Sequence, residues 1–270
     1  MLVLAVIPAR LGATRLPRKP LRLLGGEPLI VRVYERVTAL GIADRVVVAT
    51  DHPDVLAACE ARGIPALLTR DDHPSGTDRV AEVAARPEFA HFAVILNVQG
   101  DEPFVSRDAL AGAVAIVTGG HAPIGTAAVP VPVSALLKPD VVKVVRGNDG
   151  RALYFSRAPI PYLRDRADAG LQHEVARQHV GVYAYTRQAL QAWVSWAPHP
   201  LELVERLEQL RPMAHGLAIG VADVPRRRGR YRYGRRSRPR ERALEHVAYE
   251  YAVVTHLTRQ FPCPTCARIR

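Results

Sequence analysis

The feature that most constrains this fold is an alternation of short apolar runs and helical patterns through the first hundred residues. The apolar runs predict strands at residues 2–7, 45–49, 66–69 and 93–98. The stretches between them predict helices at residues 29–40, 53–62 and 78–86. Strands that alternate with helices pair in parallel, and strands covered on both faces are apolar throughout. We therefore expect an α/β fold built on a mostly parallel, twisted, Rossmann-like sheet with helices on both faces.

Beyond Pro103 this alternation becomes less regular. The patterns predict helices at residues 108–117 and 200–209, and strands at residues 125–131, 141–145 and 180–185. We find no internal repeat and no flexible linker among them. Residues 1–224 are therefore expected to form one domain with an inserted section.

The composition excludes several classes of protein. No apolar run is long enough to span a bilayer, and the N-terminus has the pattern of a buried strand instead of a signal peptide. We therefore expect a soluble, cytoplasmic protein. Three cysteines do not make a disulfide framework, and Cys59 falls on the apolar face of a predicted helix, where we expect a buried, unreactive thiol. Cys263 and Cys266 supply only half of a zinc ligand set.

The positive charge is concentrated at one end of the chain. The formal net charge is +11, and residues 226–270 contribute a net of +10 through 13 arginines and 3 glutamates. The rest of the chain is nearly neutral, which argues against a nucleic-acid-binding surface on the main domain. The stretch RRRGRYRYGRRSRPRER has neither helical nor strand periodicity. We expect residues 225–270 to form a basic, poorly ordered tail.

A cluster of cations follows the first predicted strand. The stretch IPARLGATRLPRKPL contains Arg10, Arg15, Arg18 and Lys19, and Gly12 permits close backbone approach. Parallel sheets bind ligands at the carboxyl ends of their strands, and both arginine and lysine bind phosphate oxygens. This loop is therefore predicted to bind phosphate groups, although it lacks the GxxxxGK[ST] and GxGxxG patterns.

Several motifs in register resemble one known family. The first three are IPARLGATRLPRKPL at residues 7–21, TRDDHPSGTDR at residues 69–79 and NVQGDEP at residues 97–103. YFSRAPIP, HVGVYAY and LEQLR follow in the same order. Residues 3–222 thereby resemble the sugar-activating cytidylyltransferases, more narrowly the 3-deoxy-manno-octulosonate (Kdo) cytidylyltransferases of lipopolysaccharide synthesis. Ala13 stands where that family usually has serine, and Arg18 where it commonly has glycine.

The resemblance implies which residues bind each substrate. For CTP it implies Ala9, Arg10, Gly12, Arg15, Lys19, Arg70, Ser75 and Gly76. Among these, Arg10, Arg15 and Lys19 would act in catalysis by neutralising the triphosphate and the leaving pyrophosphate. For Kdo the resemblance implies Gln99, Arg157, His179, Tyr183, Glu208 and Gln209. His179 and Tyr183 lie four residues apart and would share one face of a strand, although core packing is the alternative for both.

The resemblance also implies a metal and a mechanism. Asp101 would be a catalytic residue and a ligand of Mg²⁺, because hard cations prefer carboxylate oxygens. The anomeric hydroxyl of Kdo would attack the α-phosphorus of CTP directly, which requires positioning and charge neutralisation. For Glu102 we favour an ordinary exposed carboxylate, and for His73 a hydrogen bond that orders its loop. The family further implies a homodimer.

The tail departs from the family. Family members carry a Gly-(Ile/Val)-Asp-Thr segment, whose aspartate is a second metal ligand, just after the position of Val224. If the arginine codons of the tail are read one base later, they permit such a segment. We therefore hypothesise a one-base frameshift near residues 224–228. The DNA sequence of the gene tests this hypothesis, because it either permits the segment in the alternate frame or does not.

Three other interpretations stay open. The first is a cytidylyltransferase for sialic acid or another acidic sugar. The second is a protein that binds CTP but is inactive because it lacks the second metal carboxylate. The third is a tail that binds nucleic acid, since arginine and tyrosine suit phosphate contacts and base stacking. We favour the Kdo enzyme, with CTP and Kdo as partners and neither a membrane nor a nucleic acid among them.

Overall fold

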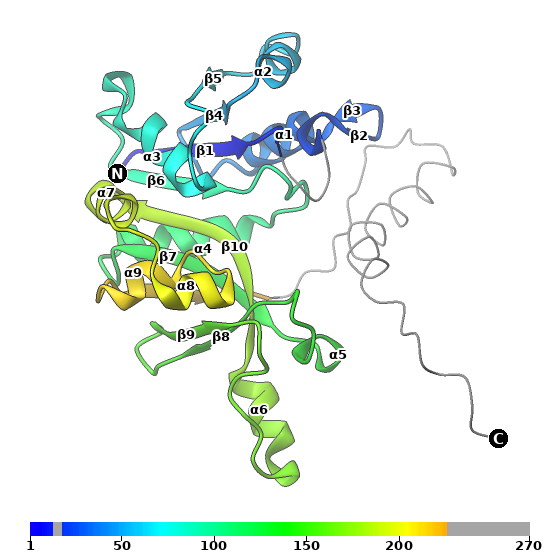
Figure 1. The fold of residues 1–270 in the computed structure, drawn as a ribbon, viewed down its shortest axis with the longest axis vertical. Coiled ribbons are helices and arrows are strands. Elements are labelled where there is room, and N and C mark those ends of the chain that lie inside the picture. The colour runs from blue at the N-terminus through cyan, green and yellow to red at the C-terminus, as the bar shows by residue number, and fades with distance from the viewer. Residues whose placement is uncertain (13–17, 226–270) are drawn as a thin grey trace, which may run out of the picture.

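The computed structural model describes residues 1–12 and 18–225. A nine-stranded sheet forms its centre, and the main path of the sheet runs β11-β7-β10-β6-β1-β4-β5 (Figure 1). Four neighbours, β1 (Val3–Ala9), β4 (Arg45–Thr50), β5 (Ala66–Leu68) and β6 (Val94–Val98), pair in parallel. The strands β7 (Ile124–Pro130) and β11 (Ile219–Asp223) are also parallel to each other. Only β10 (Arg177–Thr186) runs antiparallel along this path, so the predicted mostly parallel sheet is confirmed.

Helices cover both faces of the sheet, as predicted. Val3, Ala5 and Ile7 point from β1 into one core, which α1 (Leu29–Leu40), α2 (Pro53–Glu60) and α4 (Arg107–Thr118) complete. Leu4 and Val6 point into the opposite core, which α3 (Gly76–Ala85), α7 (Arg187–Ser195) and α9 (Leu210–Ala214) complete. This alternation follows from the two-residue period of a strand and explains why β1 is apolar throughout.

Polar side chains determine where several helices begin. Ser75 caps α3 by accepting hydrogen bonds from Thr77 N and Asp78 N, and Ser106 caps α4 in the same way. These contacts satisfy backbone donors that the first helical turn leaves unpaired. The Ser75 cap matters for function because it places the start of α3 at the carboxyl edge of the sheet.

The second half of the chain adds a smaller section. The strands β8 (Lys143–Arg146) and β9 (Ala152–Ser156) form an antiparallel hairpin, and β8 pairs with the start of β10. Figure 1 places this hairpin and α6 (Ala169–Val175) at the opposite end of the molecule from α2 and β5. The remaining short elements are η1 (Lys19–Leu21), β2 (Leu23–Leu24), β3 (Glu27–Pro28), η2 (Pro87–Phe89), α5 (Val133–Leu136), η3 (Arg166–Asp168) and α8 (Pro200–Glu205).

The helix predicted at residues 200–209 is wrong as a single element. It ends with α8 at Glu205, because Arg206 adopts a left-handed conformation with φ 54°, and a new helix begins at Leu210. The side chain of Arg157 binds the carbonyls of Glu205 and Arg206 and thereby stabilises this break. These contacts come from the residue directly after β9, which is far from α8 in the chain, so local sequence could not reveal them.

Two further expectations can be compared with the described residues. Cys59 is fully buried in α2, and burial raises the pKa of its thiol to about 11, as expected for an unreactive thiol. None of the helices in residues 1–12 and 18–225 is long and apolar enough to cross a membrane. The pair Cys263 and Cys266 and the whole basic tail lie outside the described residues.

Candidate active site

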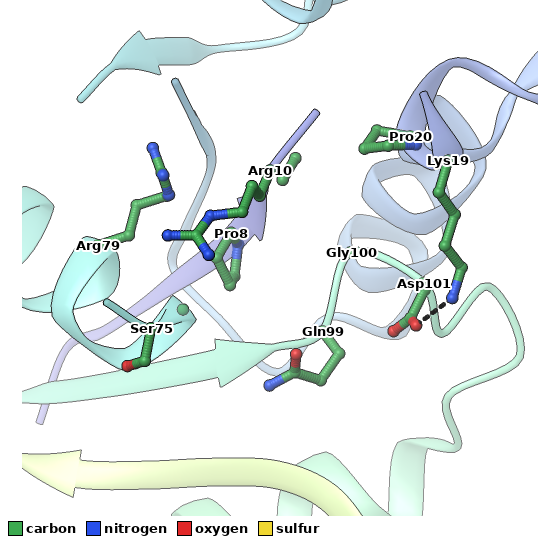
Figure 2. Close-up of a pocket in the computed structure, with 11 residues that line it drawn as sticks. Pro8, Arg10, Lys19, Pro20, Ser75, Arg79, Gln99, Gly100 and Asp101 are labelled. Carbon is green, nitrogen blue, oxygen red and sulfur yellow. Dashed lines mark hydrogen bonds and ion pairs between the residues drawn. The ribbon is translucent and has the colours of Figure 1, made fainter. Parts of the chain in front are cut away.

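A pocket of about 240 Å³ opens at the carboxyl ends of β1 and β6 (Figure 2). It is lined by Pro8, Ala9, Arg10, Lys19, Pro20, Ser75, Gly76, Arg79, Gln99, Gly100 and Asp101. Seven of these residues were predicted as site residues, namely Ala9, Arg10, Lys19, Ser75, Gly76, Gln99 and Asp101. The pocket therefore combines the three motifs of the first half at the sheet edge where parallel folds bind ligands.

Gly100 allows the two strand ends to meet. A Cβ atom at this position would lie 2.6 Å from the carbonyl oxygen of Pro8, which is closer than a side chain tolerates. Only glycine lets the turn after β6 pack directly against the end of β1. The glycine of the NVQGDEP motif thus brings Asp101 to the loop that carries Lys19.

Lys19 and Asp101 form an ion pair across the pocket, drawn as a dashed line in Figure 2. Their side chains are 36% and 45% exposed, so both remain accessible from solvent. Arg18, directly before Lys19, has a left-handed backbone with φ 57°. Glycine adopts that conformation without steric cost, which gives a physical reason for the family's glycine at this position.

Glu102, directly after Asp101, has a carboxyl group with a raised pKa. The residue is exposed, as predicted. Protein atoms nevertheless partly shield its carboxyl group from water, and this shielding, together with the charge of Asp101, raises its pKa to about 7 despite the attraction of Lys19. Glu102 does not line the pocket.

Arg10 is held by contacts with neighbouring loops. Its guanidinium donates to the carbonyl of His73, and its Nε lies 3.9 Å from Asp51 Oδ2. The ring of His73 is buried, with Nε2 2.5 Å from Glu82 Oε2. Burial opposes ionisation of Glu82, but hydrogen bonds from Arg70 N and His73 overcome it and lower its pKa. The predicted loop-ordering hydrogen bond of His73 is therefore confirmed.

Four pocket residues were not predicted, and Arg79 is the charged one among them; the others are Pro8, Pro20 and Gly100. The side chain of Arg79 is only 1% exposed, and Nη2 donates to Asp51 Oδ2 at 3.0 Å. Nη1 donates to Thr69 Oγ1 and to the carbonyl of Arg70. Burial lowers the pKa of Arg79 although Asp51 opposes the shift. The available signal was its place at the end of TRDDHPSGTDR, one helical turn after Ser75.

Two of the predicted nucleotide-binding residues, Arg70 and Gly12, do not line the pocket, and a third lies outside the described residues. The side chain of Arg70 is exposed and pairs with Asp72 at 3.0 Å. Gly12 is exposed at the end of a described segment, and Arg15 lies outside the described residues, as does Ala13. The roles implied for these residues stay predictions.

His179 and Tyr183 lie on β10, beside the pocket strand β6. Their ring centroids are 5.4 Å apart, and His179 Nε2 lies 3.0 Å from Thr126 Oγ1. Burial lowers the pKa of His179 to about 3, so its imidazole is neutral near pH 7. The hydroxyl of Tyr183 is buried and has no hydrogen-bond partner among the described residues. A Cβ at Gly181 would lie 3.7 Å from Gln99 Cγ, so this strand runs past the pocket's Gln99.

Glu208 and Gln209 lie between Arg206 and α9. Thr77 Oγ1 donates to Glu208 Oε2 at 3.0 Å, which ties this segment to the first turn of α3. Burial raises the pKa of Glu208, although hydrogen bonds from Thr77 and Ser75 oppose the shift. Gln209 is buried. The structure therefore joins Glu208 to the helix start that carries the pocket residues Ser75 and Gly76.

Arg157 is placed differently from the other predicted sugar residues. Its guanidinium donates to three backbone carbonyls: Nε to Glu205 at 2.8 Å, Nη1 to Pro139 at 3.0 Å and Nη2 to Arg206 at 3.4 Å. It does not line the pocket. Its cation is thus already used to hold two backbone segments.

Asp101 fits a metal that arrives with a nucleotide. Residues 1–12 and 18–225 contain no group of three or more His, Cys, Asp or Glu that could hold a metal ion. Magnesium commonly uses one or two carboxylates together with substrate phosphates, and Asp101 supplies one such carboxylate at the pocket edge. Asp223 is a poor substitute for the second ligand, because Arg146 and Arg177 already bind its carboxylate at 2.8 and 3.1 Å.

Comparison with known proteins shows what the whole chain is similar to. A family model described as cytidylyltransferase matches residues 4–219. A 3-deoxy-manno-octulosonate cytidylyltransferase from Gemmatimonas aurantiaca is 75% identical over 224 residues, which are 83% of this chain and 87% of the relative. One from Herminiimonas arsenicoxydans is 50% identical over 82% of this chain and 89% of the relative. A solved structure of CMP:2-keto-3-deoxy-manno-octonic acid synthetase complexed with CTP has a TM-score of 0.77 and 35% identity, covering 94% of this chain and 99% of that chain.

Proposed function

The chain belongs to the Kdo cytidylyltransferase family, and from this premise we propose that it transfers CMP from CTP to Kdo and releases pyrophosphate. The observation that carries the proposal is the pocket at the ends of β1 and β6. It combines Arg10 and Lys19 with Asp101 and opens beside the sugar-side strand β10. Its product would be CMP-Kdo, the activated sugar for lipopolysaccharide synthesis.

The residues of the pocket suit a direct displacement. Arg10 and Lys19 would neutralise charge on the triphosphate and on the departing pyrophosphate. The anomeric hydroxyl oxygen of Kdo would form a bond to the α-phosphorus and lose its proton to solvent, while the bond between that phosphorus and the bridging oxygen to the β-phosphorus breaks. Because no covalent bond to the protein is needed, catalysis would rest on positioning and charge. We assign no general base.

Magnesium is part of this proposal, with Asp101 as the protein ligand. When bound, the ion would supply positive charge and fix the orientation of phosphate oxygens. The position at which the family places a second carboxylate, just after Val224, lies outside the described residues, and the sequence has no aspartate or glutamate between Pro225 and Arg240. The exposure of Asp101 at the pocket edge supports the assignment, because its 45% exposed side chain is accessible to an ion that arrives with the nucleotide.

The sugar side would recognise Kdo mainly through neutral groups. His179 and Tyr183 offer a neutral imidazole and a buried phenol, and Gln209 offers an amide. Hydroxyl groups need donors and acceptors of this kind. Arg157 was expected to contact Kdo, but its hydrogen bonds to three carbonyls support a structural role instead.

We further propose a cytoplasmic homodimer. Tyr162, Leu171 and Val175 are 84%, 61% and 52% exposed on the section that carries α6, and such apolar side chains favour a protein contact. Light scattering on the purified chain should give twice the 29.6 kDa chain mass. A mass of one chain at micromolar concentration would contradict the dimer.

Pyrophosphate release from CTP tests the function. With Mg²⁺ present, we expect release that requires Kdo and is much slower with N-acetylneuraminate. Faster release with N-acetylneuraminate would assign the chain to sialic acid instead. CTP binding without any release would favour the inactive interpretation.

The same assay on a frame-restored chain tests the frameshift hypothesis. The alignment with the 75% identical relative leaves 17% of this chain and 13% of the relative unmatched. Restoring the frame should increase turnover by at least about tenfold if the second metal carboxylate is recovered. Equal turnover by both chains would contradict the hypothesis.

A further inference from the structure

Asp51 lies where three parts of the nucleotide pocket meet. It follows β4 directly, and Thr50 Oγ1 beside it donates to the carbonyl of Ala9 at 2.9 Å. Asp51 Oδ1 accepts a hydrogen bond from the backbone N–H of Leu11 at 3.2 Å. One carboxylate oxygen thus holds the backbone of the phosphate loop immediately after Arg10.

The other oxygen of Asp51 faces two arginines. Oδ2 accepts a hydrogen bond from Arg79 Nη2 at 3.0 Å and lies 3.9 Å from Arg10 Nε. The side chains of Asp51 and Arg79 are only 11% and 1% exposed, so water screens this pair little. Figure 2 shows Arg10 and Arg79 on the same side of the pocket. Two adjacent guanidinium groups repel each other, and Asp51 supplies the negative charge that offsets this repulsion.

A second contact holds the other side of the Arg10 guanidinium. Its Nη2 donates to the carbonyl of His73, whose ring is held by Glu82. The guanidinium of Arg10 is therefore braced between a carboxylate and a carbonyl from two different loops. Its side chain is still 43% exposed and remains available to a ligand.

We propose that Asp51 is a positioning residue for the phosphate-binding Arg10, and that its buried partner Arg79 holds Asp51 in place. This assignment rests on the proposed binding of CTP in the pocket. If the orientation of the Arg10 side chain is already set, little conformational entropy is lost when it binds a triphosphate. Loss of the Asp51 charge should therefore weaken triphosphate binding through Arg10.

Calorimetric titration of the full chain with CTP tests the proposal without requiring turnover. Asp51→Asn keeps the shape and an acceptor for Leu11 N but removes the charge, and should weaken CTP binding about five- to tenfold. The matched control is Asp44→Asn, because Asp44 Oδ2 likewise accepts a strand backbone N–H, from Val3 at 2.7 Å, and has no contact with the pocket residues. The control should change CTP affinity by less than about twofold.

A double-mutant cycle separates positioning from loss of structure. In an Arg10→Ala background, Asp51→Asn should cost less than about twofold in CTP affinity, because the group through which it acts is missing. An equal loss in both backgrounds would overturn the proposal. If Asp51→Asn does not fold, the charge-neutral double variant Asp51→Asn/Arg79→Gln leaves no unpaired buried charge and enters the same cycle.

The possible failures are distinguishable. A wild-type chain that binds CTP but releases no pyrophosphate with Kdo refutes the proposed function and leaves the result for Asp51 standing. A wild-type chain that does not bind CTP refutes both. Unchanged CTP affinity in folded Asp51→Asn refutes the positioning role alone.

Discussion

The proposed nucleotide side and the proposed sugar side of this site are built from different chemistry. On the nucleotide side, charged groups are paired before any substrate arrives, as in Lys19 with Asp101 and Arg79 with Asp51. On the sugar side, His179 is held neutral and the hydroxyl of Tyr183 is buried without a partner. The first region thus prepares charge for a polyanion, and the second leaves neutral polar groups free for hydroxyl groups.

This difference affects how much each region lowers the stability of the folded protein. Paired charges near the pocket partly compensate one another, whereas a buried phenol without a partner costs free energy until a ligand supplies one. Thr77 connects the two regions, because it begins the helix of the nucleotide side and donates to Glu208 of the sugar side. The following substitutions would test this contrast, from the largest expected effect to the smallest.

Removing the pocket carboxylate should have the largest effect. Asp101→Asn is expected to lower kcat by about 100- to 1,000-fold, because charge stabilisation in such sites carries much of the catalysis. The measurement is pyrophosphate release at saturating CTP and Kdo. Glu102→Gln is the matched control and should change kcat by less than about fivefold, since Glu102 does not line the pocket. Equal losses in both variants would contradict the assignment of Asp101.

Arg157→Gln should affect stability more than substrate binding. It removes a cation that holds three backbone carbonyls, so the free energy of unfolding should fall by about 2–3 kcal/mol. Urea denaturation measures this, and the KM for CTP should not change. A large increase in the KM for Kdo with unchanged stability would instead place Arg157 in the sugar site, as the family resemblance implies.

Thr77→Val tests the connection between the two regions. The substitution preserves shape but removes the hydroxyl that donates to Glu208, so the KM for Kdo should rise about fivefold while the KM for CTP is retained. Thr77→Ser should restore the wild-type value. Thr118→Val is a control, because that hydroxyl contacts only carbonyls of its own helix. Parallel increases in both KM values would show that Thr77 does not act on the sugar side specifically.

The neutral state of His179 predicts a pH dependence of stability. Its pKa is about 3 in the folded protein and near 6.5 when unfolded, so acid protonates the unfolded chain first. The contribution of neutral His179 to the free energy of unfolding is complete above pH 6.5 and is lost as the pH falls toward 3. Between about pH 7 and pH 5, wild-type protein should therefore lose more stability than His179→Gln. Identical pH profiles in urea denaturation would contradict a buried neutral imidazole.

The sequence predicted the nucleotide side more completely than the sugar side. Apolar runs reveal strands, and polar residues just after them mark the edge where ligands bind, so Arg10, Ser75 and Asp101 could be placed in one pocket. Arg79 was missed because its role depends on Asp51, which comes from another strand end. Such a pair is formed by the fold and leaves no local pattern.

The sugar side depends on contacts that local sequence does not encode. The break at Arg206 follows from hydrogen bonds with Arg157, 49 residues away, so the helix predicted across it was wrong. The lowered pKa of His179 follows from its partial burial beside β7 and β9, not from its neighbours in the chain. The sequence likewise gave no sign that Arg157 would be used by backbone carbonyls.

Phosphorus NMR of one reaction mixture tests the central claim most directly. This chain would be incubated with CTP, Kdo and Mg²⁺, and the resonances of the nucleotide followed over time. We predict that the three signals of CTP give way to one phosphodiester signal and one pyrophosphate signal, because the bond between the α- and β-phosphates breaks and CMP is joined to the sugar. CTP that remains unchanged, or that yields CDP and inorganic phosphate, would contradict the account.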